Sequence, residues 1–135
     1  MILYYARLFL LTFIVFFSID ILWLGFIARR LYLYFLGPLL RDPVNWTAAI
    51  LFYILFIIGL IIFAIEPALK QHSVTNAFIK GALFGFFTYM TYDLTNLAVL
   101  KDWPVGVVLI DILWGTILCS LVSGVSVYIY LAISS

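Results

Sequence analysis

The sequence predicts an all-α membrane protein, a bundle of four transmembrane helices with an interfacial segment after the first helix. Three observations lead to this fold class. Hydrophobic residues make up 67% of the 135 positions and charged residues only 10%, against about 25% charged residues in soluble domains. The apolar residues gather in four stretches, and each reaches the roughly 20 residues that a membrane-spanning helix needs. Only short polar connections separate them, so residues 1–135 are expected to form a single domain.

Charged and turn-forming residues mark the ends of the four expected helices. The helices run from about Leu3 to Ala28, Trp46 to Ile65, Thr75 to Leu100 and Val105 to Ile133. Arg29-Arg30 ends the first helix, and Glu66-Pro67 is expected to close the second, because proline disrupts the helical hydrogen-bond pattern. Asp102-Trp103-Pro104 opens the fourth with a capping carboxylate and a proline near the first turn. The first apolar run is too long for a cleaved signal peptide, so it is interpreted as a span.

The segment Leu31–Leu40 follows the first helix and reads L-Y-L-Y-F-L-G-P-L-L. It is too apolar to lie free in water and too short to cross a bilayer. One interpretation is an interfacial or partly re-entrant segment. The other is a plain connector that rests on the lipid surface.

Small residues recur four apart on the last two expected helices. Gly81 and Gly85 lie on the third, and Gly115, Cys119 and Ser123 lie on the fourth. This spacing lets helix backbones approach closely in lipid. It favours either packing between these two helices or a contact between copies of the chain. A homo-oligomer is therefore one of two possibilities.

Three aspartates, Asp20, Asp93 and Asp111, lie inside the apolar stretches. An ionisable side chain at the bilayer centre costs about 2.5–3.5 kcal/mol and needs a partner or a function. At a rise of about 1.5 Å per residue, the three lie roughly 13, 12 and 10 Å from the nearest ends of their helices. With alternating helix directions, those three ends lie on one membrane face. The acids are therefore expected in one layer.

Aromatic and amide side chains accompany the aspartates on the same helix faces. The candidate ligand-binding residues are Asp20, Trp23, Tyr89, Tyr92, Asp93, Asn96, Asp111 and Trp114. Trp23 and Trp114 each follow an aspartate by three residues, which places tryptophan and carboxylate on one face. Tyr89, Asp93 and Asn96 share a face in the same way, with Tyr92 beside it.

This constellation predicts a polar pocket with carboxylates at its base and aromatic walls. Oxygen ligands favour hard cations such as Mg²⁺, Ca²⁺ or Mn²⁺, and any such metal would be held by Asp20, Asp93 and Asp111. Aromatic walls beside an acid favour an amine through cation–π contact. A proton is the third candidate ligand, and no cofactor is identified. The structural alternative is that tryptophan, tyrosine and basic groups satisfy the acids, or that burial keeps them protonated.

Three function classes follow. The leading one is a membrane protein that binds or transports a cation or a small polar ligand, with membrane lipid as its surroundings. The second is a membrane-embedded enzyme acting on a lipid, and the third is a structural or accessory subunit. With a net charge of +1, the chain has no excess of basic residues that would attract nucleic acid. A single cysteine, Cys119, excludes an intrachain disulfide and a multi-cysteine metal site.

Several motifs resemble a bacterial family of small, uncharacterised four-helix integral membrane proteins. They include D-I-L-W-L-G at 20–25, E-P-A-L at 66–69, G-A-L-F-G at 81–85, T-Y-D-L-T-N-L-A at 91–98 and D-I-L-W-G at 111–115. They cover nearly the whole chain in order. The resemblance implies four spans and a place in the bacterial inner membrane. It brings no activity, since the function of that family is not established.

Overall fold

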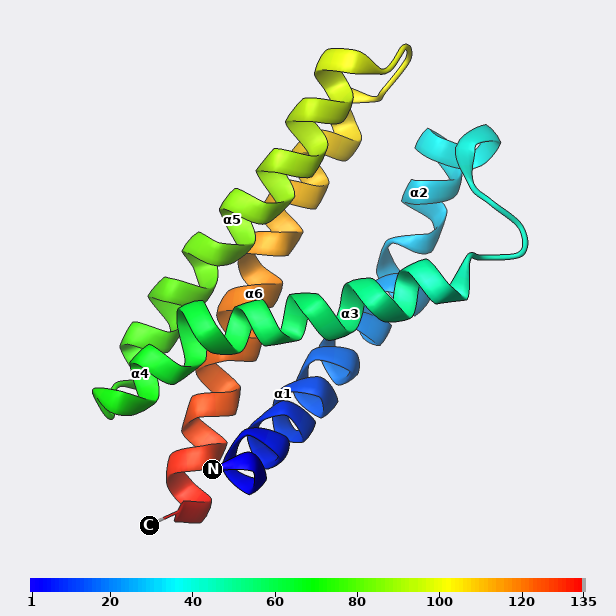
Figure 1. Ribbon diagram of the computed structural model, residues 1–135. Coiled ribbons are helices and arrows are strands. Elements are labelled where there is room, and N and C mark those ends of the chain that lie inside the picture. Colours follow the sequence, from blue (N-terminus) through cyan, green and yellow to red (C-terminus); the bar gives the residue numbers. More distant parts are fainter. Residues whose placement is uncertain (135) are drawn as a thin grey trace.

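The computed structural model describes residues 1–134, and these residues form helices and no strand. The elements are α1 (Ile2–Leu22), the π-helical η1 (Trp23–Ile27), α2 (Arg29–Leu36), the 3-10 helix η2 (Gly37–Leu39), α3 (Trp46–Leu60), the π-helical η3 (Ile61–Ile65), α4 (Glu66–Lys70), α5 (Val74–Val99) and α6 (Val105–Ser134). Figure 1 shows α5 and α6 side by side, with α1 and α3 against one part of this pair. The expectation of an all-α protein is confirmed.

Within residues 1–134, three helical stretches are long and apolar enough to cross a membrane. They are Ile2–Ile27, Trp46–Lys70 and Val105–Ser134. The fourth expected span corresponds to α5, which has 26 residues. Threonine, asparagine and charged side chains such as Lys80 make α5 less apolar than the other three.

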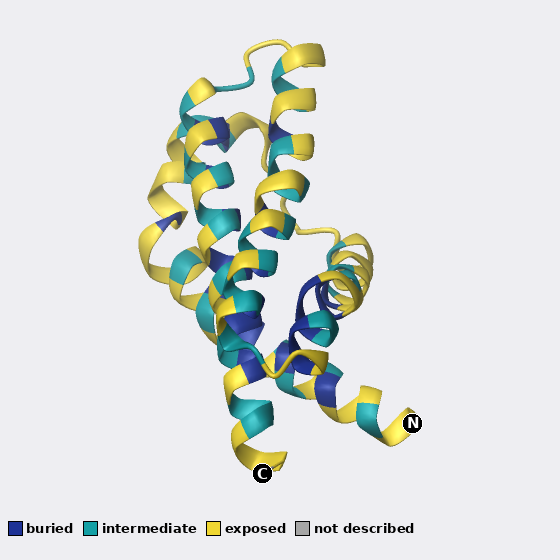
Figure 2. Ribbon diagram, turned by 90° about the vertical axis from the view of Figure 1, so that its left-hand side faces the viewer, coloured by how far each residue is buried: buried dark blue, intermediate teal, exposed yellow. Residues whose placement is uncertain are grey.

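The buried core lies where α1, α3 with η3, and α6 meet. Its largest fully buried apolar side chains include Leu8, Phe16, Ile57, Leu60, Ile65, Leu118 and Val122. Figure 2 shows buried positions where helices meet and exposed positions on the outer surface. Large apolar side chains such as Phe26 and Phe63 are exposed there. Exposed apolar surface on this scale is typical of a surface that contacts lipid or a partner.

Helices α5 and α6 approach so closely that only glycine fits at the contact. A Cβ atom on Gly81 would lie 2.3 Å from the carbonyl oxygen of Cys119, and one on Gly85 would lie 2.1 Å from that of Gly115. The small residues therefore pack these two helices of one chain together, as one of the two interpretations predicted.

The second expected helix does not end at Glu66-Pro67, so that prediction is wrong. The helix continues through η3 and α4 to Lys70. Proline cannot donate the usual hydrogen bond, but the π-helical turn before it already departs from the regular pattern, so the chain passes Pro67 without stopping. The Tyr5 hydroxyl donates to Glu66 Oε1 at 2.9 Å, which links α4 to the start of α1.

The segment after the first helix is itself mostly helical. Figure 1 shows α2 near the end of the molecule where α5 turns into α6. Ala28 and Leu36 are buried, whereas Tyr34 is exposed. A Cβ on Gly106 would lie 2.8 Å from Phe35 Cζ, so α2 packs against the first turn of α6.

Candidate functional site

Asp93 of α5 and Asp111 of α6 form a buried pair of acids. Their side chains lie within hydrogen-bonding reach of each other. Asp93 has 0% and Asp111 7% of its surface exposed. Neither carboxylate oxygen of Asp93 accepts a hydrogen bond from an N–H or O–H group of residues 1–134. The Trp103 indole approaches Asp93, but its buried Nε1 also makes no hydrogen bond.

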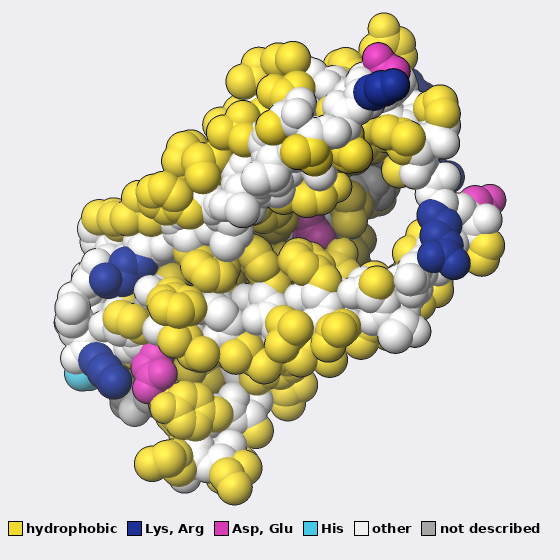
Figure 3. All heavy atoms as spheres, turned by 45° about the horizontal axis from the view of Figure 1, so that its top comes forward, with side chains coloured by type: hydrophobic (Ala, Val, Ile, Leu, Met, Phe, Trp, Pro, Cys, Tyr) yellow, Lys and Arg dark blue, Asp and Glu magenta, His cyan; other side chains and the backbone are white. Residues whose placement is uncertain are grey.

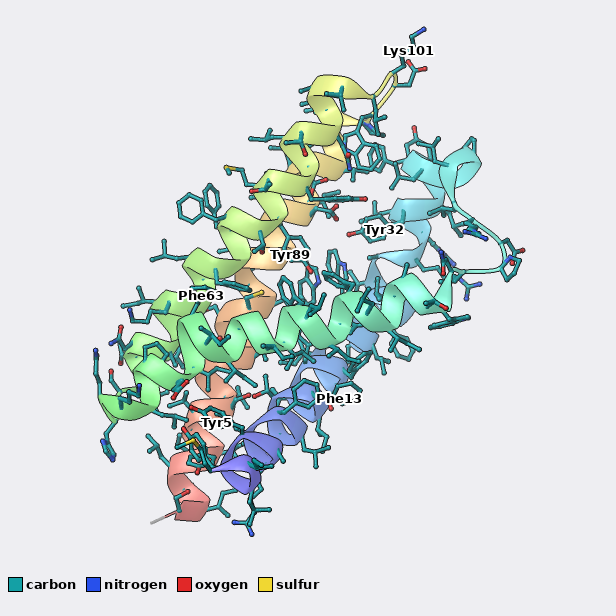
Figure 4. All side chains as sticks on the ribbon, viewed as in Figure 1. Tyr5, Phe13, Tyr32, Phe63, Tyr89 and Lys101 are labelled. Carbon is teal, nitrogen blue, oxygen red and sulfur yellow. The ribbon has the colours of Figure 1, made fainter. Side chains whose placement is uncertain are left out.

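Tyr32 of α2 contacts this pair of acids from outside the interface between α5 and α6. Its hydroxyl donates a hydrogen bond to Asp111 Oδ1, and Figure 4 shows the ring of Tyr32 directed from α2 toward α5 and α6. Burial, followed by the hydrogen bond to Asp111, raises the pKa of the Tyr32 hydroxyl. Tyr32 therefore keeps its proton and remains a hydrogen-bond donor.

Tyr32 was not among the residues that the sequence predicted. A signal for it existed, because Ala28, Tyr32 and Leu36 recur four apart and all turn inward in the structure. That spacing marks one face of a helix. The interfacial interpretation of Leu31–Leu40 includes no helical period, so it does not single out Tyr32.

Asp20 belongs to a different part of the site. Trp23 and Trp114 stack face to face, with ring centroids 4.4 Å apart and an interplanar angle of 10°. Asp20, with 7% of its surface exposed, interacts with the indole of Trp114. The buried Nε1 atoms of both indoles make no hydrogen bond within residues 1–134. The two D-I-L-W motifs thus meet in space, although they lie on helices far apart in sequence.

A cavity of about 150 Å³ lies beside this tryptophan stack. It is lined by Asp20, Trp23, Leu24, Tyr32, Phe52, Tyr53, Tyr89 and Trp114. Asp20 is the single acid among these lining residues, and six of the eight are aromatic.

The predicted site residues therefore separate into two groups. Asp20, Trp23, Tyr89 and Trp114 line the cavity, whereas Asp93 and Asp111 pair beside it. Tyr89 interacts with both Asp20 and Asp111, so it lies between the two groups.

The other two predicted residues, Tyr92 and Asn96, do not line the Asp20 cavity. Tyr92 lines a separate cavity of about 320 Å³ together with Tyr89, and Asn96 interacts with Tyr92. Tyr92 is also half exposed, with 54% of its surface accessible. Helical spacing thus predicted that one face of α5 contributes to the site. It did not predict that, of these three residues, Tyr89 borders the Asp20 cavity while Tyr92 and Asn96 do not.

The three aspartates do not come together as one metal site. Within residues 1–134 no group of three or more His, Cys, Asp or Glu side chains could hold a metal ion. Basic residues do not neutralise the aspartates either. The one ion pair in the described part of the chain joins Lys70 and Glu66 at 3.7 Å. Figure 3 likewise shows the basic side chains of one face near the ends of the molecule.

The sequence did not predict two residues in the wall of the cavity, Phe52 and Tyr53 of α3. Helix α3 is apolar on all sides, so its sequence contains no amphipathic pattern that would indicate an inward face. Packing against α1 orients them, and the Phe17 and Tyr53 rings lie 4.7 Å apart between centroids.

Comparison with known protein families identifies the family of this chain. A family model described as "Predicted membrane protein (DUF2177)" matches residues 5–128. No curated protein and no solved structure matches the chain. The resemblance of the sequence motifs to an uncharacterised membrane-protein family is confirmed.

Proposed function

Because this chain belongs to the DUF2177 family of predicted membrane proteins, we propose that it works within the bilayer as a binding or transport protein for a small organic cation. It is an integral, multi-pass membrane protein whose apolar outer surface contacts lipid. The resemblance to a bacterial family supports the bacterial inner membrane as its location.

The cavity around Asp20 is the observation that supports this function. It combines one carboxylate with walls made by Trp23, Trp114 and four further aromatic rings. An ammonium group gains electrostatic attraction from aromatic faces, and more so where water is excluded. A cavity of about 150 Å³ matches one that holds benzene in another protein. Methylammonium and tetramethylammonium are therefore suitable in size.

The charge of Asp20 also favours a cation as ligand. An ionised carboxylate removed from water needs a compensating charge or a set of hydrogen bonds. No Lys, Arg or His of residues 1–134 forms an ion pair with Asp20. A bound cation supplies the missing charge. Asp20 is alone among the lining residues in being acidic, which favours binding over an enzyme that needs two carboxyl groups as acid and base.

We also infer that α5 is the fourth span. Its 26 residues extend about 39 Å, and it lies antiparallel to the apolar α6 (Figure 1). Thr88, Thr91 and Thr95 donate their hydroxyl groups to carbonyl oxygens of the preceding turn, as Thr91 does to Phe87 at 2.6 Å. Such internal hydrogen bonds make polar residues tolerable in lipid. With four spans, α2 then lies near the membrane surface, as the interfacial interpretation predicted.

The test is calorimetric titration of the purified protein in lipid nanodiscs with methylammonium and tetramethylammonium. We expect Asp20→Asn to weaken binding roughly tenfold or more, because a hydrogen bond or contact to a charged group contributes about 1.5–3 kcal/mol. Asp102→Asn, in the exposed α5–α6 turn, is the matched control and should bind as the unaltered protein does. Equal affinity in both variants would contradict the proposal, as would no binding by the unaltered protein.

A further inference from the structure

We propose that Asp93 and Asp111 form a proton-binding site, separate from the Asp20 cavity, and that Tyr32 couples the two sites. The proton site is independent of the proposed function, whereas the coupling rests on it.

The first argument is the contact between the two carboxyl groups. Asp93 and Asp111 lie within hydrogen-bonding reach, yet an ionised carboxylate can only accept hydrogen bonds. Two ionised groups this close repel each other, and burial strengthens the repulsion. A single proton between them removes one charge and supplies the donor that the contact requires. The pair is therefore expected to hold one proton when no cation is bound to it.

The second argument is that the protein leaves Asp93 without another partner. Asp93 is completely buried, and both of its carboxylate oxygens lack a hydrogen bond within residues 1–134. Buried polar atoms in native proteins are nearly always satisfied. A proton shared with Asp111 satisfies one oxygen of each group.

The surroundings of the pair favour a proton over a metal ion. The titratable groups that face it are the hydroxyls of Tyr32, Tyr89 and Tyr92. No basic side chain of residues 1–134 forms an ion pair with either acid, and no metal-binding group of three ligands is present there. A hard divalent cation prefers six or more oxygen ligands or waters, and two buried carboxyl groups supply at most four oxygen atoms.

Tyr32 provides the connection between the two sites. Its hydroxyl donates to Asp111, while the same side chain lines the cavity that contains Asp20. When the pair loses its proton, the added negative charge near the cavity attracts a cation. By linkage, cation binding at Asp20 then promotes release of the proton from Asp93 and Asp111.

The proton site is tested by infrared spectroscopy of the protein in nanodiscs. At neutral pH we expect a band from a protonated carboxyl group that disappears in Asp93→Asn and in Asp111→Asn. Tyr32→Phe should shift this band, because it removes one hydrogen bond and leaves both acids in place. Asp102→Asn is the control and should change nothing. A neutral-pH spectrum without a band that responds to any of the first three variants would overturn the proton site.

The coupling is tested by titrating methylammonium in buffers with different ionisation enthalpies, which counts the protons released for each cation bound. The unaltered protein should release protons, and the number released should fall in Asp93→Asn. Binding without proton release in the unaltered protein would overturn the coupling. An infrared band without any methylammonium binding would leave the proton site in place and remove the proposed function, so the two failures are distinguishable.

Discussion

Trp23 and Trp114 stack with their ring centroids 4.4 Å apart and their planes 10° from parallel. One ring comes from the π-helical turn η1 after α1, and the other from α6. Each follows an aspartate by three residues, so the stack joins the helices that contain Asp20 and Asp111. It also forms one wall of the cavity.

Replacing Trp114 with alanine should weaken both the fold and the binding of a cation. Truncating a fully buried aromatic side chain costs about 3–5 kcal/mol, and the partly buried Trp114 should cost less than that. An aromatic pair contributes about 0.5–1.5 kcal/mol beyond its buried area. Trp114→Phe keeps an aromatic wall and should lose less. Unfolding in SDS measures the stability, with Trp46→Phe as a control because Trp46 is 64% exposed. Equal stability of Trp114→Ala and the control would show that the stack contributes nothing.

Enlarging Gly85 should separate α5 from α6. An added Cβ would lie 2.1 Å from the carbonyl oxygen of Gly115, which is too close for any adjustment of a side chain to relieve. We expect Gly85→Ala to destabilise the protein by about 1–3 kcal/mol, the usual range for overpacking. Gly25→Ala is the matched control, since nothing lies within 4 Å of its added Cβ. A Gly85→Ala protein as stable as the control would contradict this close packing.

Removing the Tyr32 hydroxyl should loosen α2. Its hydrogen bond to the Asp111 carboxylate involves a charged or proton-sharing acid, and such bonds contribute about 1.5–3 kcal/mol. In Tyr32→Phe we expect faster amide hydrogen exchange across Arg29–Leu36 and little change in α3. Tyr34→Phe is the control, because Tyr34 is 82% exposed. Unchanged exchange of α2 in Tyr32→Phe would argue that other contacts hold this helix.

Both chain termini should lie on the same face of the membrane. Four spans require it, and Figure 1 shows the N-terminus and the end of α6 at one end of the molecule. Reporter fusions before Met1 and after α6 measure the side on which each terminus lies. Reporters on opposite sides would mean that α5 does not cross the bilayer.

The all-α fold and most helix positions were predictable because lipid imposes them. Each span needs about 20 apolar residues, and its backbone must form its own hydrogen bonds. The α5–α6 packing was one of the two arrangements that small residues four apart predicted, the other being a contact between copies of the chain. The continuation past Pro67 was not, because a π-helical turn such as η3 has no sequence signature in a uniformly apolar stretch.

The sequence by itself determined which helices contain the acids and which face of each helix they share with an aromatic residue. Only the tertiary structure decided that Asp93 pairs with Asp111 while Asp20 borders its own cavity, and that Tyr32 and Tyr53 contribute to it. The reason is physical. In water, an amphipathic pattern sets the rotation of each helix, but helices that are apolar on all sides contain no such pattern. Their rotation depends on side-chain packing between helices, which appears only when the whole bundle is assembled.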